Sequence, residues 1–170
     1  MDDQRWHGVD TSEFRRTLGT FCTGVAIVTG LNRGSPTGFT VQSLVSLSLS
    51  PPLIGLSPAK TSDTWKCIRP SQRFCANILA REQAQLCRTF ATKGADRFSG
   101  VGWRPSATGL PVLDDVVAYV CCTLEAEHET GDHFFVVGRV EELALLRAQA
   151  EPLLILRGAL INIPTMEAVG

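Results

Sequence analysis

The chain has 170 residues, of which 44% are apolar and 19% are charged, and its formal net charge is −1. This length and apolar fraction suit a single globular domain and exclude a wholly disordered chain. A net charge this small, with no cluster of Lys and Arg, excludes a protein that binds nucleic acid without regard to sequence. Any phosphate group must therefore be bound in one local pocket.

Nothing in the sequence predicts export or a membrane span. The first ten residues lack the apolar segment of a signal peptide, and no window of about eighteen residues is continuously apolar. We therefore expect a cytoplasmic protein. In that compartment six irregularly spaced cysteines are expected to be reduced thiols rather than a disulfide framework; they are Cys22, Cys67, Cys75, Cys87, Cys121 and Cys122.

The N-terminal part predicts a tail, a helix and a strand. Residues 1–10 are expected to form a loose tail. Asp10 and Glu13 resemble a capping box, and the apolar spacing that follows predicts a short amphipathic helix over about 11–20. The β-branched run at 25–29 predicts a buried strand, and 32–36 has the residue types of a turn.

Residues 40–50 alternate as a strand does, and the alternation changes phase at Ser43-Leu44, which predicts a bulge or bend. Further along, apolar runs predict five more strands and two helices. The strands are expected over 53–56, 74–79, 119–128, 133–143 and 153–156, the helices over 61–69 and 81–92, and a long loop over 93–112. About seven short strands with two or three peripheral helices, in no βαβ order, predict a mainly β fold built as an antiparallel barrel.

The segment 55–62 joins a strand to a helix start. Lys60 stands where a P-loop has its second glycine, so a Walker A motif is excluded. Free N–H groups, hydroxyls and one ammonium at a helix start still suit a phosphate. An ordinary Ser/Thr cap explains the same residues, and the local sequence alone favours the cap.

One face of 40–50 is neutral and rich in hydrogen-bonding groups; it comprises Thr40, Gln42, Ser43, Ser46 and Ser48. Such a row suits the edge of a heteroaromatic ring, for example the pyrimidine end of a flavin. A solvated edge strand explains it equally well.

Conventional catalytic and metal motifs are not found. His128 and His133 flank a short turn, but no third ligand completes a zinc site. His133 either faces a ligand or is a structural histidine. There is no Gly-x-Ser-x-Gly, and no Gly-x-Gly-x-x-Gly follows a strand, so a bound dinucleotide would not lie on a Rossmann fold.

The order of short motifs along about residues 12–160 resembles the flavin reductase domain family, the reductase components of two-component monooxygenases. The motifs are FRxxLGxFxTGV at 14–25, GFTxxS at 38–43, SLSxxPPL at 46–53, SPAKTSxTW at 57–65, RFCANIL at 73–79, DRFxGVxW at 96–103, GDHFxxxGRV at 131–140 and PLLxxRG at 152–158.

The resemblance implies a six-stranded Greek-key split β-barrel over 11–163, followed by a tail over 164–170, and a homodimer with its flavin groove near the subunit interface. It also implies that the protein transfers a hydride from NADH, with NADPH less favoured, to FAD or FMN. The reduced flavin then leaves for a separate monooxygenase. The cofactors supply the hydride chemistry, so no catalytic acid, base or nucleophile is expected.

The resemblance also implies the site residues. Those for the flavin are Gly38, Phe39, Thr40, Gln42, Ser43, Ser57, Pro58, Ala59, Lys60, Thr61, Ser62, Asn77, Arg97 and Phe98. Those for the nicotinamide nucleotide are Asp132, His133 and Arg157.

Two other functions suit a split barrel. One is a non-catalytic flavin- or haem-binding protein. The other is an oxidase acting on a phosphorylated substrate such as a pyridoxine phosphate. An oxidase of that kind needs several cations for the second phosphate, and only Lys60, Arg97 and Arg157 are available.

Overall fold

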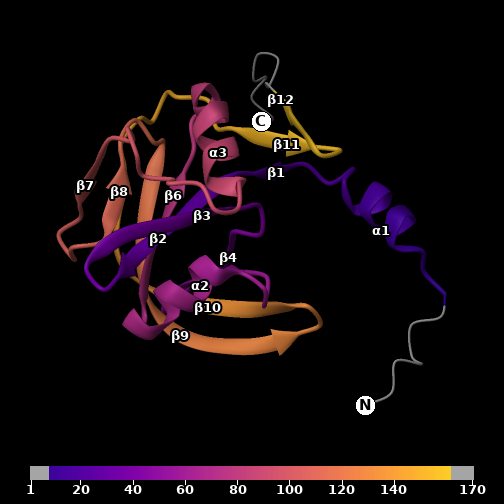
Figure 1. Cartoon of the computed structure of the whole chain (residues 1–170), viewed down its shortest axis with the longest axis horizontal. Coiled ribbons are helices and arrows are strands. Elements are labelled where there is room, and N and C mark those ends of the chain that lie inside the picture. The colour runs from indigo at the N-terminus through magenta and orange to yellow at the C-terminus, as the bar shows by residue number, and fades with distance from the viewer. Residues whose placement is uncertain (1–7, 162–170) are drawn as a thin grey trace.

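The computed structural model describes residues 8–161 and consists mainly of antiparallel strands (Figure 1). The main sheet has seven strands in the order β3-β2-β6-β9-β10-β5-β4. In chain order these are β2 (Ala26–Asn32), β3 (Ser35–Val41), β4 (Val45–Leu49), β5 (Pro52–Leu56), β6 (Arg73–Ile78), β9 (Ala118–Thr130) and β10 (His133–Leu145).

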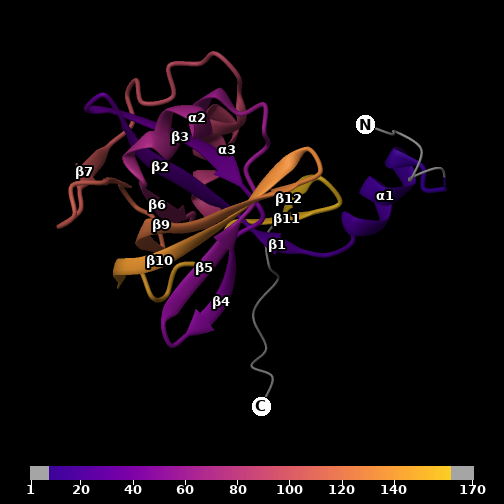
Figure 2. The same cartoon turned by 90° about the horizontal axis from the view of Figure 1, so that it is seen from below.

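Two smaller sheets and three α-helices complete the described part of the chain. One sheet contains β1 (Thr23–Gly24), β11 (Leu154–Leu156) and β12 (Ala159–Ile161), and the other contains β7 (Trp103–Pro105) and β8 (Pro111–Leu113). The helices are α1 (Thr11–Leu18), α2 (Asp63–Ile68) and α3 (Ala84–Ala91), with 3-10 turns at Arg69–Ser71 and Arg81–Gln83. Helix α1 stands clear of the sheets in both views (Figures 1 and 2).

The predicted mainly β fold with peripheral helices is confirmed, but the six-stranded barrel is not. The main sheet has seven strands, and its edge strands β3 and β4 do not pair with each other. Sequence reasoning also missed the β7–β8 hairpin inside the predicted loop 93–112, and strand β12. These strands have three residues each, too few to show a period of two. The tail 164–170 and the first seven residues of the tail 1–10 lie outside the described residues.

The main sheet buries apolar side chains on both faces. One cluster lies on the face covered by α3 and β8 and includes Ile27, Phe90 and Cys121. The other lies on the face covered by α2 and includes Val28 and Cys122. Neighbouring strand residues point to opposite faces, so consecutive residues enter different clusters. Burial on both faces gives a rigid frame for the loops at its edge.

Local signals set the helix starts. Asp10 caps α1 by accepting a hydrogen bond from the Glu13 backbone N–H at 3.0 Å. Ser62 caps α2 by accepting from the Trp65 N–H at 3.2 Å. Trp65 and Ile68 are fully buried, as the spacing of apolar residues predicts.

The Glu142 carboxylate fastens the turn between β7 and β8 to the main sheet and also binds Tyr119 on the neighbouring strand. The Tyr119 hydroxyl donates to Glu142 Oε1 at 2.6 Å, and the Glu142 carboxylate also accepts from the N–H groups of Ala107 and Thr108. The hydrogen bond to Glu142, together with burial, raises the pKa of Tyr119 to about 12.

This raised pKa predicts a loss of stability at high pH. The pKa of Tyr119 is higher in the folded than in the unfolded chain, so its contribution is complete below about pH 10 and is lost as pH rises towards 12. Tyr119 is the only tyrosine, so phenolate ultraviolet absorption follows this group alone. We expect Tyr119→Phe to remove this pH dependence of the unfolding free energy. Titration of the folded protein at the ordinary tyrosine pKa would contradict the argument.

No helix among residues 8–161 has both the length and the hydropathy needed to cross a membrane.

Candidate functional site

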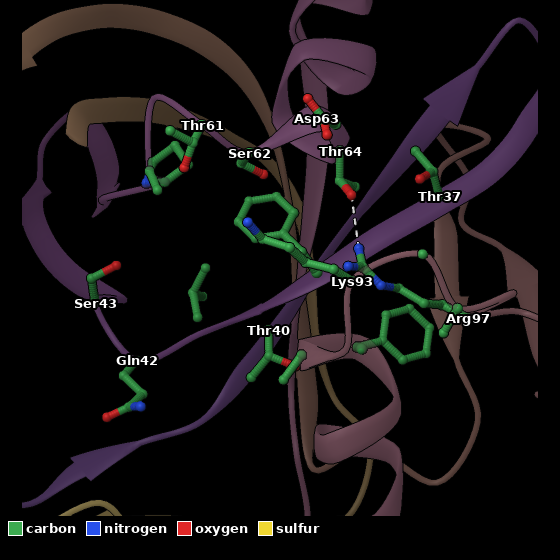
Figure 3. Close-up of a pocket in the computed structure, with 18 of the residues that line it drawn as sticks. Thr37, Thr40, Gln42, Ser43, Thr61, Ser62, Asp63, Thr64, Lys93 and Arg97 are labelled. Atoms are coloured by element: carbon green, nitrogen blue, oxygen red, sulfur yellow. Dashed lines mark hydrogen bonds between the residues drawn. The ribbon is translucent and has the colours of Figure 1, made fainter. Parts of the chain in front are cut away.

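A groove with a volume of about 750 Å³ opens beside the edge of the main sheet (Figure 3). This volume is in the range of small-molecule sites in proteins. Three segments supply most of its wall: the end of β3 and the residues after it (39–43), the loop between β5 and α2 with the first turn of α2 (57–64), and the segment 90–98. His133, at the start of β10, completes it.

Backbone hydrogen bonds join the 57–62 loop to the 131–134 turn. The Lys60 N–H donates to the Asp132 carbonyl, and the Phe134 N–H donates to the Pro58 carbonyl, both at 2.9 Å. Ala59 and His133 form an antiparallel bridge between them. Two motifs separated by some seventy residues in the chain therefore meet at one end of the groove.

Three hydroxyl groups of the groove are arranged to donate. Ser43 Oγ accepts from the Ser57 N–H at 2.8 Å, Ser62 Oγ accepts from the Trp65 N–H, and Thr64 Oγ1 accepts from Arg97. Each of these oxygens already has a donor, so each O–H remains free to donate to a ligand. Figure 3 shows Ser43 and Ser62 among the residues that line the groove.

Two further polar side chains of the wall differ in what they offer a ligand. The Gln42 amide oxygen accepts from Thr23 Oγ1 at 3.4 Å, which leaves its NH₂ group free to donate. Thr40 Oγ1 donates to the Cys87 carbonyl at 2.8 Å, so this hydroxyl has only acceptor capacity left. The wall thus suits a ligand edge that carries mainly acceptors, such as the N1, O2 and O4 edge of a flavin or a phosphate.

Arg97 ties three parts of the site together. Its Nη1 donates to the Gly38 carbonyl and to Thr64 Oγ1, each at 2.7 Å, and Nε and Nη2 donate to the Thr92 carbonyl at 3.0 and 2.8 Å. Burial lowers the pKa of this guanidinium from its ordinary value. The bonds to Gly38 and Thr64 hold the 92–98 segment against β3 and α2, and the two bonds to Thr92 brace the segment itself. Figure 3 shows the bond between Arg97 and Thr64.

Aromatic rings form the apolar part of the wall. Phe39, Phe90 and Phe98 line the groove. Phe90 and Phe98 pack edge to face with centroids 5.1 Å apart, and Trp103 packs on Phe98 in the same manner at 6.2 Å. These contacts hold Phe98 in place over an apolar surface that suits a planar ring.

His133 is half-exposed at the other end of the groove. Its Nδ1 lies 2.7 Å from Asp132 Oδ1. The hydrogen bond from His133 is the main cause of the lowered pKa of Asp132. The Asp132 carboxylate therefore orients the imidazole, whose Nε2 is left for another partner.

The structure brings most of the predicted site residues to the groove wall. These are Phe39, Thr40, Gln42, Ser43, Ser57, Pro58, Ala59, Thr61, Ser62, Arg97, Phe98 and His133. Ser46 and Ser48, predicted to share the polar face, are not part of this wall. The chain leaves β3 at Val41 and enters β4 at Val45, and this break turns the two serines away.

Asn77 was predicted to contact the flavin, but it does not line the groove. It is fully buried, and its amide donates to the Ile27 carbonyl and to Thr29 Oγ1 while its oxygen accepts from the Leu113 N–H. All of these partners are protein groups, so Asn77 is structural rather than a flavin contact. Gly38 also lies outside the wall, because its carbonyl binds Arg97 and a Cβ there would lie 2.9 Å from the Val28 carbonyl oxygen.

Lys60, Asp132 and Arg157 also lie outside the groove wall. The Lys60 ammonium pairs with Glu129 Oε2 at 2.9 Å instead of pointing to a phosphate. Asp132 is exposed beside His133. Arg157 lines a different hollow near α1. For Lys60 a partner from a distant segment, Glu129, decides where the side chain points.

Sequence reasoning missed several wall residues, among them Thr37, Thr64, Phe90, Lys93 and Asp96. Lys93 and Asp96 lie in the stretch before Arg97, which was predicted only as loop. The only sequence signal for Lys93 and Asp96 was their position, with Gly94, just before Arg97, which was expected to bind the flavin.

The sequence and fold match known flavin reductases. Residues 18–164 match the family model of the flavin reductase like domain. The chain belongs to this family. It is 44% identical over 150 residues to the reductase subunit HsaB of a flavin-dependent monooxygenase from Rhodococcus jostii, covering 88% of this chain and 76% of that protein.

Solved structures of flavin reductase family members have the same fold. Component B of nitrilotriacetate monooxygenase from Mycobacterium thermoresistibile superposes with a TM-score of 0.86 at 41% identity, covering 94% of this chain and 93% of that one. The NADH:FAD oxidoreductase of Streptomyces globisporus C-1027 has a TM-score of 0.86 at 30% identity, covering 95% and 92%. The open seven-stranded sheet is therefore a flavin reductase fold.

Proposed function

We propose that the protein is an NADH:flavin oxidoreductase that reduces FAD or FMN and releases the reduced flavin to a separate monooxygenase. Membership of the flavin reductase family supports this function. The observation that carries it to this chain is the groove wall, where Ser43, Ser62 and Thr64 each keep a free O–H donor beside aromatic rings. An acceptor-rich planar ring with a phosphate matches that wall.

Named residues would hold each part of the flavin. Gln42 and Ser43 would donate to the pyrimidine edge, and Phe98 would cover the ring. Thr61 and Ser62 would donate to the phosphate. Lys93 is added to the predicted set, because it supplies the ammonium that Lys60 does not bring to the groove.

The bound flavin supplies the chemistry, since it accepts a hydride from the reduced nicotinamide. The side chains position the ligands and exclude water, and none of them is required as an acid, base or nucleophile. Donors at the pyrimidine edge favour the reduced ring, because it carries more negative charge there.

The decisive experiment mixes the purified protein with NADH and excess FAD or FMN and follows the nicotinamide absorbance. Flavin-dependent oxidation of NADH supports the proposal. Stoichiometric flavin that NADH does not reduce would support the alternative, a non-catalytic binding protein. A parallel assay with NADPH tests the expected preference for NADH.

His133 is expected to bind the nicotinamide. His133 lines the groove and its Nδ1 binds Asp132, which leaves Nε2 for a ligand, so we expect His133→Ala to raise the KM for NADH more than the KM for flavin. His128→Ala is the matched control, because His128 lies on β9 outside the groove wall. Equal changes in the KM for NADH and for flavin, or no change in either, would show that His133 does not bind the nicotinamide.

We also propose that the protein is a homodimer. Helix α1 and the residues beside it leave large apolar side chains exposed, with Phe14 and Leu18 each 55% exposed and Phe21 75% exposed. A second copy that covers them would stabilise the assembly. Light scattering is expected to give about twice the chain mass of 18.4 kDa, and Phe14→Glu is expected to give a monomer. A monomeric wild-type protein would contradict this proposal.

A further inference from the structure

A second hollow lies between α1 and the turn that joins β11 to β12. It has a volume of about 440 Å³ and is lined by Arg15, Arg16, Thr20 and Arg157; we call it the arginine pocket. In Figure 1 the β11–β12 turn reaches towards α1, which otherwise stands apart from the sheets. Three arginines from two distant segments therefore line one hollow.

The backbone holds the two segments together. The Arg157 N–H donates to the Gly19 carbonyl at 2.7 Å, and the Gly19 N–H donates to the Arg15 carbonyl at 2.9 Å. Arg157 has a φ of 52°, a left-handed conformation that is uncommon for residues other than glycine, asparagine and aspartate. The chain thus places Arg157 beside the helix that carries the other two arginines.

No carboxylate of the described residues forms an ion pair within the arginine pocket. Within residues 8–161 none of its arginines forms an ion pair, whereas four other arginines pair with glutamates: Arg69, Arg81, Arg139 and Arg147. The dipole of α1 favours cations in its last turn, which accounts for Arg15 and Arg16 but not for Arg157. Like charges held together are stabilised by an anion, and guanidinium groups match the geometry of phosphate oxygens.

In both views the turn between β9 and β10, which contains Asp132, lies on the same side of the molecule as α1 and the β11–β12 turn (Figures 1 and 2). Arg15 is close enough to Asp132 for its charge to add to the lowering of the Asp132 pKa, after the larger effect of the His133 hydrogen bond. Asp132 is the neighbour of His133, which lines the groove. An elongated ligand with one end at His133 can therefore extend towards these arginines.

We propose that the arginine pocket binds the diphosphate group of the nicotinamide dinucleotide whose nicotinamide lies at His133. This inference rests on the proposed function, since it assigns the second half of the same substrate. Arg15 and Arg157 would each donate to diphosphate oxygens, and Arg16 would add charge at the rim. The pocket would then contribute to the affinity for the dinucleotide without touching the reacting rings.

The test uses ADP-ribose, which carries the diphosphate but no nicotinamide, and measures its binding to the whole protein by calorimetry. We expect Arg15→Gln and Arg157→Gln each to raise its Kd about tenfold, because each removes a charge-assisted hydrogen bond. Arg157→Lys should retain part of the affinity. Arg104→Gln is the control, since Arg104 is exposed on β7, on the opposite side of the molecule from α1 (Figure 1).

Kinetics separate the possible sources of the diphosphate. The KM for NADH is expected to rise in the two glutamine variants while the KM values for FMN and FAD stay unchanged. A rise for FAD alone would overturn the proposal, because the arginines would then bind the diphosphate of FAD. Binding of only the 2′-phosphorylated form of ADP-ribose would also overturn it.

Two further outcomes separate this inference from the proposed function. Arginine-dependent binding of ADP-ribose by a protein that reduces no flavin would support the pocket and contradict the proposed function. If instead the protein reduces flavin but wild type and variants bind ADP-ribose with equal affinity, the result would support the proposed function and contradict the pocket. Loss of the dimer in Arg157→Gln with unchanged ADP-ribose affinity would overturn the inference too, because it would assign the arginines to a second copy of the chain.

Discussion

Arg97→Met is expected to raise the KM for flavin by about tenfold or more. The guanidinium donates four hydrogen bonds: those to Gly38 and Thr64 tie the 92–98 segment to β3 and α2, and the two to the Thr92 carbonyl brace the segment itself. A bond from a charged donor contributes about 1.5–3 kcal/mol, and 1.4 kcal/mol corresponds to a tenfold change in affinity. Methionine keeps the length of the side chain but none of these donors. The segment that carries Lys93 and Phe98 would then no longer be held over the groove.

Steady-state kinetics at saturating NADH measure this effect, and thermal unfolding shows whether the fold survives. Arg97→Lys should recover only part of the affinity, since one ammonium cannot reach the carbonyls on both sides. Arg88→Met is the matched control, because Arg88 is an exposed arginine of the neighbouring helix α3 and lies outside the groove wall. A flavin KM that stays at the wild-type value in Arg97→Met would show that the segment is held by other contacts.

Asn77→Ala is expected to lower the free energy of unfolding by about 3–5 kcal/mol. The amide satisfies the Ile27 carbonyl, Thr29 Oγ1 and the Leu113 N–H, all in the buried core. Each buried group left without a partner costs about 1–3 kcal/mol, and the lost side-chain volume adds a cavity. For a chain of this size the midpoint of thermal unfolding should fall by about 10 °C.

The same variant separates a structural role for Asn77 from a ligand contact. At a temperature where the variant is folded, the KM for flavin should stay unchanged, because Asn77 does not line the groove. Asn32→Ala is the control, since Asn32 is an exposed residue at the end of β2. Unchanged thermal stability together with a raised flavin KM would show that Asn77 contacts the flavin.

The elements that depend on local interactions were predictable from the sequence. The Asp10 cap, the buried pair Trp65 and Ile68, and the opposite orientations of Cys121 and Cys122 follow from spacing within a few residues. The motif order, which spans nearly the whole chain, indicated the family. The sheet edges were not predictable, because pairing of strands far apart in the chain leaves no local pattern.

Predictions for single side chains failed where a distant residue competes for the same group. Lys60 was expected at a phosphate, but Glu129, 69 residues away, takes its ammonium. Thr64 belongs to the motif at 57–65 but was not predicted as a site residue; it lines the groove, where Arg97, 33 residues away, binds its hydroxyl.

The sequence by itself determined the family, the mainly β class and the segments that form the groove, because helix caps, strand alternation and short motifs are properties of neighbouring residues. Only the tertiary structure decided which hydroxyls keep a free donor, which cations reach the groove, and that three arginines meet beside α1. Hydrogen bonds and charges act over a few ångströms in space, and the fold alone sets which distant residues come within that range.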